Sequence, residues 1–380
     1  QSWFKQHVPA VAFSTPPRES MVDPYIYMPS CSKTDRKGVS AWPSLCLIAL
    51  TASRSVRASA AQPSIACSGS SVSLEQRQLE PHTLYKRYVT VEDFHTIRRE
   101  YWLEVSQLPI SPAPLLLAFH GQSGQADDFA RRHNYSHFGQ AEGLVVIYPQ
   151  GVNDSPSPDE DRGTGWNVGS AGIIGNATCI PGGVGEAGAC YKSCKLMNKC
   201  GRCNWSTCYD DVLYVQEVLR QAAQELCIDL NRVYIQGESN GAEMVQHLVR
   251  EVPNLFAGVS VWFGTPLSGF LLGNKMQLIS ASPQVQKIAM LSLHGRNDTT
   301  IPAGGGVSAD GWIFESVNAA VGVWALLQGC ERESTRLFTQ WDGGPLRFEC
   351  FEHMNCQSQV HRRVVSCFYD GIHGDYPSGT

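Results

Sequence analysis

The amino-acid sequence predicts an α/β fold built on a mostly parallel central sheet. The first observation is a series of short apolar runs, which are typical of strands buried on both faces. The second is that amphipathic helical periods separate several of these runs, an alternation that places helices on both faces of a parallel sheet. The predicted strands are Leu115–Phe119, Val145–Tyr148, Arg232–Gly237, Ala257–Phe263, Ile288–Leu293 and Val364–Tyr369.

The helices follow from apolar residues that recur with a period of 3.6. We predict them over Val212–Leu226, Met244–Val252 and Ile313–Leu327. The segment His95–Gln107 instead alternates apolar and polar residues, as an edge or antiparallel strand does. Residues 329–367 carry four cysteines and are expected to form a loop-rich surface layer.

The composition is that of a globular chain without a nucleic-acid surface. Of the 380 residues, 43% are hydrophobic and 17% are charged, which supplies enough apolar material for a sizeable core. The formal net charge is -5, and no Lys/Arg run is dense enough to bind nucleic acid. The apolar stretch Leu45–Leu50 is too short to span a bilayer. We therefore expect neither a nucleic-acid partner nor a membrane span.

The cysteines and the N-terminal region predict a secreted protein. The chain has 14 cysteines, a number typical of disulfide-bonded proteins in an oxidising compartment. A basic segment at 33–37 precedes the apolar stretch and Ala58-Ser59-Ala60 follows it, which is the layout of a signal peptide. We expect residues 1–60 to be a leader and residues 61–380 a single extracellular domain. Glycosylation sequons begin at Asn134, Asn153, Asn176, Asn204 and Asn297.

A cysteine-rich insert is expected over residues 151–208. Its Cys200-Gly201-Arg202-Cys203 has the spacing of half a zinc site, but no second matched pair accompanies it, so disulfides are the better interpretation. Removing Cys31 and Cys46 with the leader leaves an even number of cysteines, which permits full pairing. The connectivity stays open. We expect no metal and no cofactor.

The pentapeptide Gly237-Glu238-Ser239-Asn240-Gly241 predicts a catalytic serine. It directly follows a predicted strand and directly precedes a predicted helix, which is the setting of a nucleophile elbow. The glycines are required because the serine backbone is strained and side chains beside it would collide with the strand or helix.

A serine nucleophile needs a base and an acid, and in this setting they follow it in the order acid, then base. His373 lies on a glycine-flanked loop after the last predicted strand and is the expected base, with His353 as second choice. His247 follows too closely on the helix, and His294 lies at the end of a strand. Asp298 follows the strand Ile288–Leu293 and is the expected acid, which orients the imidazole.

Backbone N–H groups must stabilise the oxyanion that forms when the serine attacks. We expect one from Asn240, directly after the nucleophile, and one from Gln122 in the small-residue loop after Leu115–Phe119. Trp166 and Glu238 are candidates for lining the substrate pocket, as is Trp205, although both tryptophans are equally expected to pack against disulfides.

With these residues assembled, the chain resembles the polyhydroxybutyrate depolymerase and feruloyl esterase group. The matching segments are Phe119-His120-Gly121, Val146–Gly151, Gly165-Trp166-Asn167, Tyr209–Val212, Arg232–Gly241, His294-Gly295 with Asp298, and Gly371-Ile372-His373. The resemblance implies an α/β-hydrolase fold and hydrolysis of carboxylic esters. Feruloyl or acetyl esters of polysaccharides and short hydroxyalkanoate esters all stay open as substrates, and we expect a monomer. The resemblance also implies the triad Ser239, Asp298 and His373.

The chain departs from the family pattern at two places. Relatives usually carry a second glycine after the elbow, where this chain has Ala242. They usually carry Trp and Pro after the catalytic histidine, where this chain has Gly374-Asp375-Tyr376-Pro377. Three alternatives stay open: a serine peptidase on the same fold, a catalytically silent binding protein, and a zinc-stabilised binding protein built on the insert.

Overall fold

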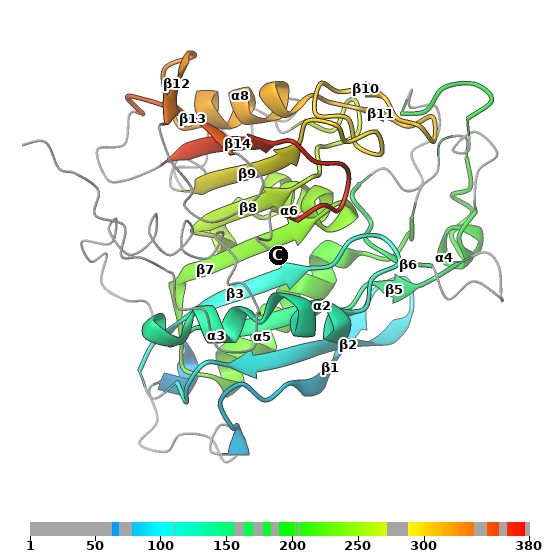
Figure 1. The fold of residues 1–380 in the computed structure, drawn as a ribbon. Coiled ribbons are helices and arrows are strands. Elements are labelled where there is room, and N and C mark those ends of the chain that lie inside the picture. Colours follow the sequence, from blue (N-terminus) through cyan, green and yellow to red (C-terminus); the bar gives the residue numbers. More distant parts are fainter. Residues whose placement is uncertain are drawn as a thin grey trace, which may run out of the picture.

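A computed structural model shows one central sheet with helices on both faces (Figure 1). The described residues are 63–67, 78–109, 111–155, 163–169, 178–183, 190–201, 203, 206–271, 288–337, 348–356 and 363–376. The predicted signal peptide and Trp205 lie outside these ranges.

The sheet is parallel at its centre and antiparallel at both edges. In spatial order its strands are β1 (Tyr85–Glu92), β2 (Thr96–Val105), β4 (Val145–Pro149), β3 (Ala113–Phe119), β7 (Ile228–Glu238), β8 (Gly258–Trp262), β9 (Ala289–Gly295), β14 (Val364–Tyr369), β13 (Glu349–His353) and β12 (Ser334–Leu337). Neighbours from β4 to β14 are parallel, whereas the outer strands pair antiparallel. The carboxyl ends of the parallel strands therefore meet at one edge, where ligands bind in sheets of this kind.

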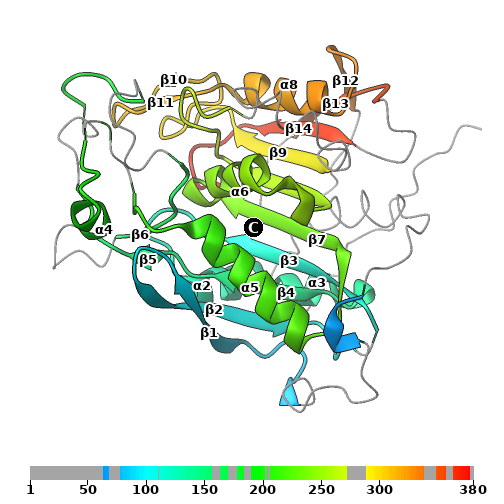
Figure 2. The same ribbon diagram turned by 180° about the vertical axis from the view of Figure 1, so that it is seen from behind.

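Helices cover the two faces of the sheet. The front view shows α2 and α3 against one face, and the view from behind shows α5 and α6 against the other (Figures 1 and 2). The α-helices are α2 (Ala126–His133), α3 (Tyr135–Phe138), α4 (Lys192–Leu196), α5 (Asp211–Glu225), α6 (Asn240–Glu251) and α8 (Val317–Leu327). Short elements complete the described chain: η1 (Ile65–Cys67), η3 (Gln140–Glu142), η4 (Pro253–Leu255), β5 (Val152–Asn153), β6 (Thr164–Gly165), β10 (Gly306–Val307) and β11 (Ile313–Phe314).

The core lies on both sides of the central strands. Along β3, every residue is buried. Leu115 and Leu117 belong to the buried cluster that includes residues of α5, α6 and α8, whereas Leu116 and Ala118 belong to the cluster that includes residues of α2. Side chains alternate between the faces of a strand, so a continuous apolar run is what a doubly covered strand requires. The prediction of a mostly parallel sheet with helices on both faces is confirmed.

Two parts of the sequence prediction are wrong. Ile313 lies in strand β11 rather than in a helix, and α8 begins only at Val317 because the Ser316 hydroxyl caps it, accepting the N–H of Ala319 at 3.0 Å. Residues 329–367 are also not all loop. They contain β12 and β13, which extend the sheet edge. These strands are short and carry mixed residues, so their periodicity is too weak to detect.

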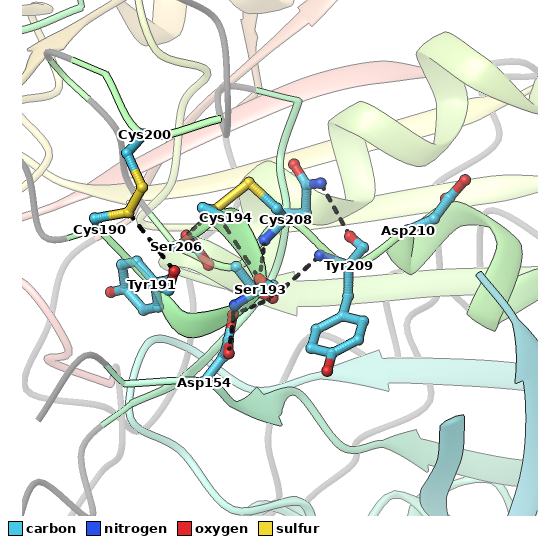
Figure 3. Close-up of a disulfide and its surroundings, with 12 residues drawn as sticks. Asp154, Cys190, Tyr191, Ser193, Cys194, Cys200, Ser206, Cys208, Tyr209 and Asp210 are labelled. Carbon is cyan, nitrogen blue, oxygen red and sulfur yellow. Dashed lines mark hydrogen bonds between the residues drawn. A yellow bond between two sulfur atoms is a disulfide. The ribbon is translucent and has the colours of Figure 1, made fainter. Parts of the chain in front are cut away.

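Disulfides and a small buried cluster of Tyr191, Cys194 and Cys208 hold the described part of the cysteine-rich insert. The carboxylate of Asp154 accepts the Ser193 N–H at 3.1 Å, beside the Cys194–Cys208 bridge (Figure 3). It also accepts the Thr207 hydroxyl at 3.0 Å. The bridges of the described chain are Cys67–Cys227, Cys179–Cys203, Cys190–Cys200, Cys194–Cys208, Cys330–Cys356 and Cys350–Cys367. Both sulfurs of the Cys-X-X-Cys therefore belong to disulfides, which leaves no thiolate there for zinc.

Candidate active site

Ser239 sits at the apex of a sharp turn between β7 and α6. Its backbone has φ 53° and ψ -124°, outside the regions that non-glycine residues ordinarily adopt. Such strain persists only where the surroundings impose it. The Ser239 N–H donates to the carbonyl oxygen of Trp262 at 3.0 Å, which anchors the turn to the end of β8. The strand, turn and helix expected of a nucleophile elbow are present.

The two glycines of the elbow are required by contact distances. A Cβ added to Gly237 would lie 2.1 Å from the carbonyl oxygen of Gly241. A Cβ added to Gly241 would lie 2.4 Å from the carbonyl oxygen of Phe119, at the end of β3. Both neighbours are backbone atoms, so they cannot move aside as a flexible side chain can. The elbow is thus packed directly against β3.

The next residue of the helix explains one departure from the family pattern. Ala242 is fully buried, and a Cβ added to Gly264 would lie 2.5 Å from the Ala242 methyl group. The helix can therefore carry a methyl group at this position because the facing residue, after β8, is glycine.

Three side chains from separate parts of the sequence form a hydrogen-bonded chain at this edge of the sheet. The imidazole Nε2 of His373 lies 2.9 Å from the Oγ of Ser239. Its Nδ1 lies 2.7 Å from the Oδ2 of Asp298. The structure therefore brings together the three residues that the sequence assigns to nucleophile, base and acid. In this geometry the Nδ1–H donates to the carboxylate, which leaves Nε2 free to accept the serine proton.

Asp298 is held in its ionised form. Burial raises the pKa of its carboxyl, but hydrogen bonds from His294 and His373 outweigh burial and lower that pKa to about 2. The second carboxylate oxygen accepts the N–H groups of Thr300 and Ile301, at 2.9 and 2.8 Å. A fixed anion at this position orients the imidazole and stabilises its protonated form.

His294 is a functional candidate that the sequence argument set aside. Its Nε2–H donates to the carbonyl oxygen of Ile301 at 2.7 Å and lies 3.4 Å from the Oδ2 of Asp298. The sequence feature that could have indicated this role is the position of His294 at the end of β9, four residues before Asp298. His353, the second choice for the base, lies instead on β13, where its Nδ1 is 3.0 Å from the Glu331 carbonyl oxygen. His247 contacts Arg250 on the outer turn of α6.

The loop after β3 lies against the serine and carries the expected oxyanion donor Gln122. A Cβ added to Gly121 would lie 3.1 Å from the Cβ of Ser239, so the two segments touch. The Nδ1–H of His120 donates to the Gly121 carbonyl oxygen at 2.7 Å. Because that peptide is planar and trans, fixing its carbonyl also fixes the Gln122 N–H, which points the opposite way. Among the described residues, no protein group accepts from the N–H of Gln122 or of Asn240.

His120 is buried and neutral. Its burial lowers the pKa of the imidazole to about 4, against a smaller opposing effect of the Gly121 carbonyl. Its Nε2 accepts the N–H of Gly151 at 3.0 Å, which is possible only for an unprotonated nitrogen. The imidazole thus joins the loop after β3 to the loop after β4.

The two pocket candidates lie inside the protein rather than on a pocket surface. Trp166 is 0% exposed, its Nε1–H donates to the carbonyl oxygen of His120, and its backbone N–H donates to the Oδ1 of Asn240, both at 2.8 Å. Glu238 is 3% exposed and turns toward α2. The expectation for Trp166 and Glu238 is corrected because Trp166 packs beneath the elbow, and Glu238, at the end of β7, points away from the serine.

A buried ion pair supports the loop that carries Trp166. Arg99 donates to one oxygen of Asp211 at 2.7 Å, and the other oxygen accepts the Asn167 N–H at 2.7 Å. Burial raises the pKa of Asp211, and the Arg99 guanidinium opposes that rise. Asp211 and Asn167 both lie in segments that carry the family resemblance. Their contact gives a structural reason for both residues.

No described helix is long and apolar enough to cross a membrane. No group of three or more His, Cys, Asp or Glu side chains in the described ranges is arranged to hold a metal ion.

The order of the strands and the serine turn at the carboxyl end of β7 place the molecule in the α/β-hydrolase fold class. Over part of its length the chain is similar to fungal feruloyl and acetylxylan esterases. It is 32% identical to the probable feruloyl esterase C of Aspergillus niger over 98 residues, 26% of this chain and 32% of that relative. It is 26% identical to the acetylxylan esterase A of Aspergillus oryzae over 157 residues, 41% of this chain and 39% of that relative.

The similarity to these relatives covers only part of their length. The matched segments span 32 to 39% of these curated relatives. No family model matches the chain. Among solved structures, the acetyl xylan esterase from Aspergillus awamori has a TM-score of 0.45 and 14% sequence identity, and the alignment covers 76% of this chain and 94% of that one.

Proposed function

We propose that the protein is a secreted serine esterase that hydrolyses carboxylic esters. The observation that carries this proposal is the hydrogen-bonded chain from Ser239 through His373 to Asp298, with the serine on a strained elbow. A peptide backbone held in this conformation costs stability, and sites of catalysis are where such strain is concentrated. The similarity to fungal feruloyl and acetylxylan esterases supports an ester as the substrate.

The proposed reaction is transfer of an acyl group to water. Ser239 Oγ attacks the ester carbonyl as His373 Nε2 takes the serine proton. The N–H groups of Asn240 and Gln122 stabilise the resulting oxyanion. The intermediate collapses, His373 gives the proton to the departing alcohol, and an acyl-serine remains. A water molecule, deprotonated by His373, then attacks the acyl-serine to release the acid and restore Ser239.

The proposed substrates are feruloyl or acetyl esters of polysaccharides, with short hydroxyalkanoate esters as a further class. Because Trp166 and Glu238 are buried, neither can select among these acyl groups by direct contact. The disulfides are typical of a protein that acts outside the cell, where polymeric esters are found.

Replacement of the serine tests the proposal. We expect Ser239→Ala to fold normally and to lose at least ~10⁴-fold in kcat for p-nitrophenyl acetate, methyl ferulate and acetylated xylan, since the acyl-enzyme cannot form. The control is Ser334→Ala, an exposed serine on β12, which should retain full activity. A fluorophosphonate probe should label the wild type and the control but not Ser239→Ala.

Three results would contradict the proposal. Undiminished activity in Ser239→Ala rejects the serine mechanism. Faster cleavage of p-nitroanilides than of matched esters indicates a peptidase. A wild-type protein that neither hydrolyses esters nor reacts with the probe indicates a silent binding protein.

A further inference from the structure

The carboxylate of Glu238 joins three distant segments beneath the candidate active site. Glu238 is the last residue of β7 and directly precedes the serine, and its side chain is 4% exposed. Its Oε1 lies 3.1 Å from the Nε2 of His133, on α2. Its Oε2 accepts the hydroxyl of Tyr376 at 2.5 Å. The third segment therefore comes from the loop that follows β14.

That loop also carries His373, in the same turn as Tyr376. The Asp375 N–H donates to the Ile372 carbonyl oxygen at 3.2 Å, and the Asp375 carboxylate accepts the Ile372 N–H at 2.8 Å. The Tyr369 hydroxyl donates to the Asp375 carbonyl oxygen at 2.8 Å. These hydrogen bonds make the turn rigid. A contact that fixes the position of Tyr376 therefore also fixes the position of His373.

The strand order shows why the loop that carries His373 needs an additional contact to stay in place. β14 and β7 are separated in the sheet by β9 and β8. The loop after β14 must therefore cross two strand ends to bring its histidine to the serine, a distance of roughly 14 Å at the usual strand spacing. The Asn297 N–H donates to the Gly371 carbonyl oxygen at 3.0 Å, which attaches the start of the loop to the segment just after β9.

Tyr376 reaches across the remaining gap. Its ring meets that of Phe263, just after β8, edge to face at a centroid distance of 5.6 Å. The same phenylalanine ring lies 5.2 Å from the imidazole of His373. The tyrosine hydroxyl then ends on Glu238, beside the serine. Burial, and then the neighbouring Glu238 carboxylate, raise the pKa of Tyr376, so the hydroxyl keeps its proton and donates it to this bond.

We propose that Tyr376 is a positioning residue, which fastens the loop carrying His373 to the strand carrying Ser239 through its hydrogen bond to Glu238. This inference rests on the proposed esterase function, because it concerns the Ser239–His373 contact. Small misplacements of reacting groups reduce the chemical step strongly, whereas substrate affinity depends on other contacts. The bond therefore acts on kcat.

The experiment compares two tyrosines that each donate to a buried glutamate. In Tyr376→Phe the ring contacts stay and the hydroxyl is lost. In Tyr148→Phe, on β4, the lost bond is the one to Glu104, 3.2 Å long and in the hydrophobic cluster beneath α2. We expect Tyr376→Phe to lower kcat for p-nitrophenyl acetate by ~10 to 100-fold with KM unchanged. Its rate of fluorophosphonate labelling should fall in parallel, whereas Tyr148→Phe should keep the wild-type kcat.

A second pair of variants separates the hydrogen bond from overall stability. Glu238→Gln retains an oxygen that accepts the tyrosine hydroxyl and should keep most of the activity. Glu238→Leu removes the acceptor and should resemble Tyr376→Phe in kcat. Wild-type kcat in Tyr376→Phe, or equal losses in Glu238→Gln and Glu238→Leu, would overturn the inference. A wild-type protein that neither hydrolyses the ester nor reacts with the probe would overturn the proposed function instead.

Discussion

The elbow and the cysteine-rich insert both lie at the carboxyl edge of the sheet, yet they are held in opposite ways. The elbow, residues 237–241, is fixed by backbone contacts between regular elements, with Gly241 packed against the end of β3. The insert has one five-residue α-helix, α4, among its described residues. It is fixed by three disulfides and by the carboxylate of Asp154.

The two regions are stabilised differently because they have different requirements for precise geometry. A nucleophile and its base tolerate little misplacement, and contacts between packed strands and helices leave few alternative positions. A surface loop whose described residues form only a small apolar cluster needs only to stay folded, which covalent links achieve mainly by restricting the unfolded chain. We therefore expect substitutions in the elbow to affect kcat and those in the insert to affect stability.

Among the substitutions that test this comparison of the two regions, Gly241→Ala gives the largest expected effect. The added methyl group would lie 2.4 Å from the Phe119 carbonyl oxygen and 2.5 Å from that of His120, so the end of β3 must move. We expect kcat/KM to fall by at least ~100-fold. The control is Gly322→Ala in α8, where the new methyl group meets nothing within 4 Å and should stabilise the helix by about 1 kcal/mol. Normal activity in Gly241→Ala would show that the elbow is not tightly packed.

Removal of one bridge from the insert gives an intermediate effect. The double variant Cys194→Ser with Cys208→Ser opens a loop of sequence separation 14 and should lower the free energy of unfolding by about 3 kcal/mol in urea titrations. Because neither cysteine touches the elbow, kcat should change less than twofold, roughly the scatter of assays at unperturbed sites. A large loss of kcat in a fully folded variant would contradict the separation of the two regions.

Ala242→Gly gives the smallest effect and tests the boundary of the elbow. Glycine within the first turn of α6 should cost about 1 kcal/mol of stability. The catalytic geometry should survive, because the methyl group only fills space before Gly264. Thermal unfolding and kcat together check this. If kcat falls although the variant is fully folded at the assay temperature, the Ala242 methyl group also helps to position the catalytic residues.

The sequence was most informative where local pattern and function coincide. The elbow could be predicted because its glycines, strand and helix are consecutive, and the chain order then pointed to Asp298 and His373. The central strands could be predicted because burial on both faces requires continuous apolar runs.

Long-range polar contacts outside the Ser239, His373 and Asp298 set could not be predicted. Nothing local shows that Trp166 lies under the elbow or that Glu238 turns toward Tyr376 rather than toward a pocket. The partner of Cys67 was equally hidden, because disulfide connectivity depends on the folded arrangement and not on spacing. Edge strands such as β13 escaped because their mixed residues give no clear period.

The bridge between Cys67 and Cys227 has a mechanical consequence. Cys227 directly precedes β7, and 160 residues of sequence separate the two sulfurs. Tension applied to the chain before Cys67 therefore passes through the bridge to β7, the strand that directly precedes Ser239, and it bypasses every residue between the cysteines. In a pulling experiment on the oxidised protein, roughly 500 Å of contour length should stay hidden, and a reducing agent should release it.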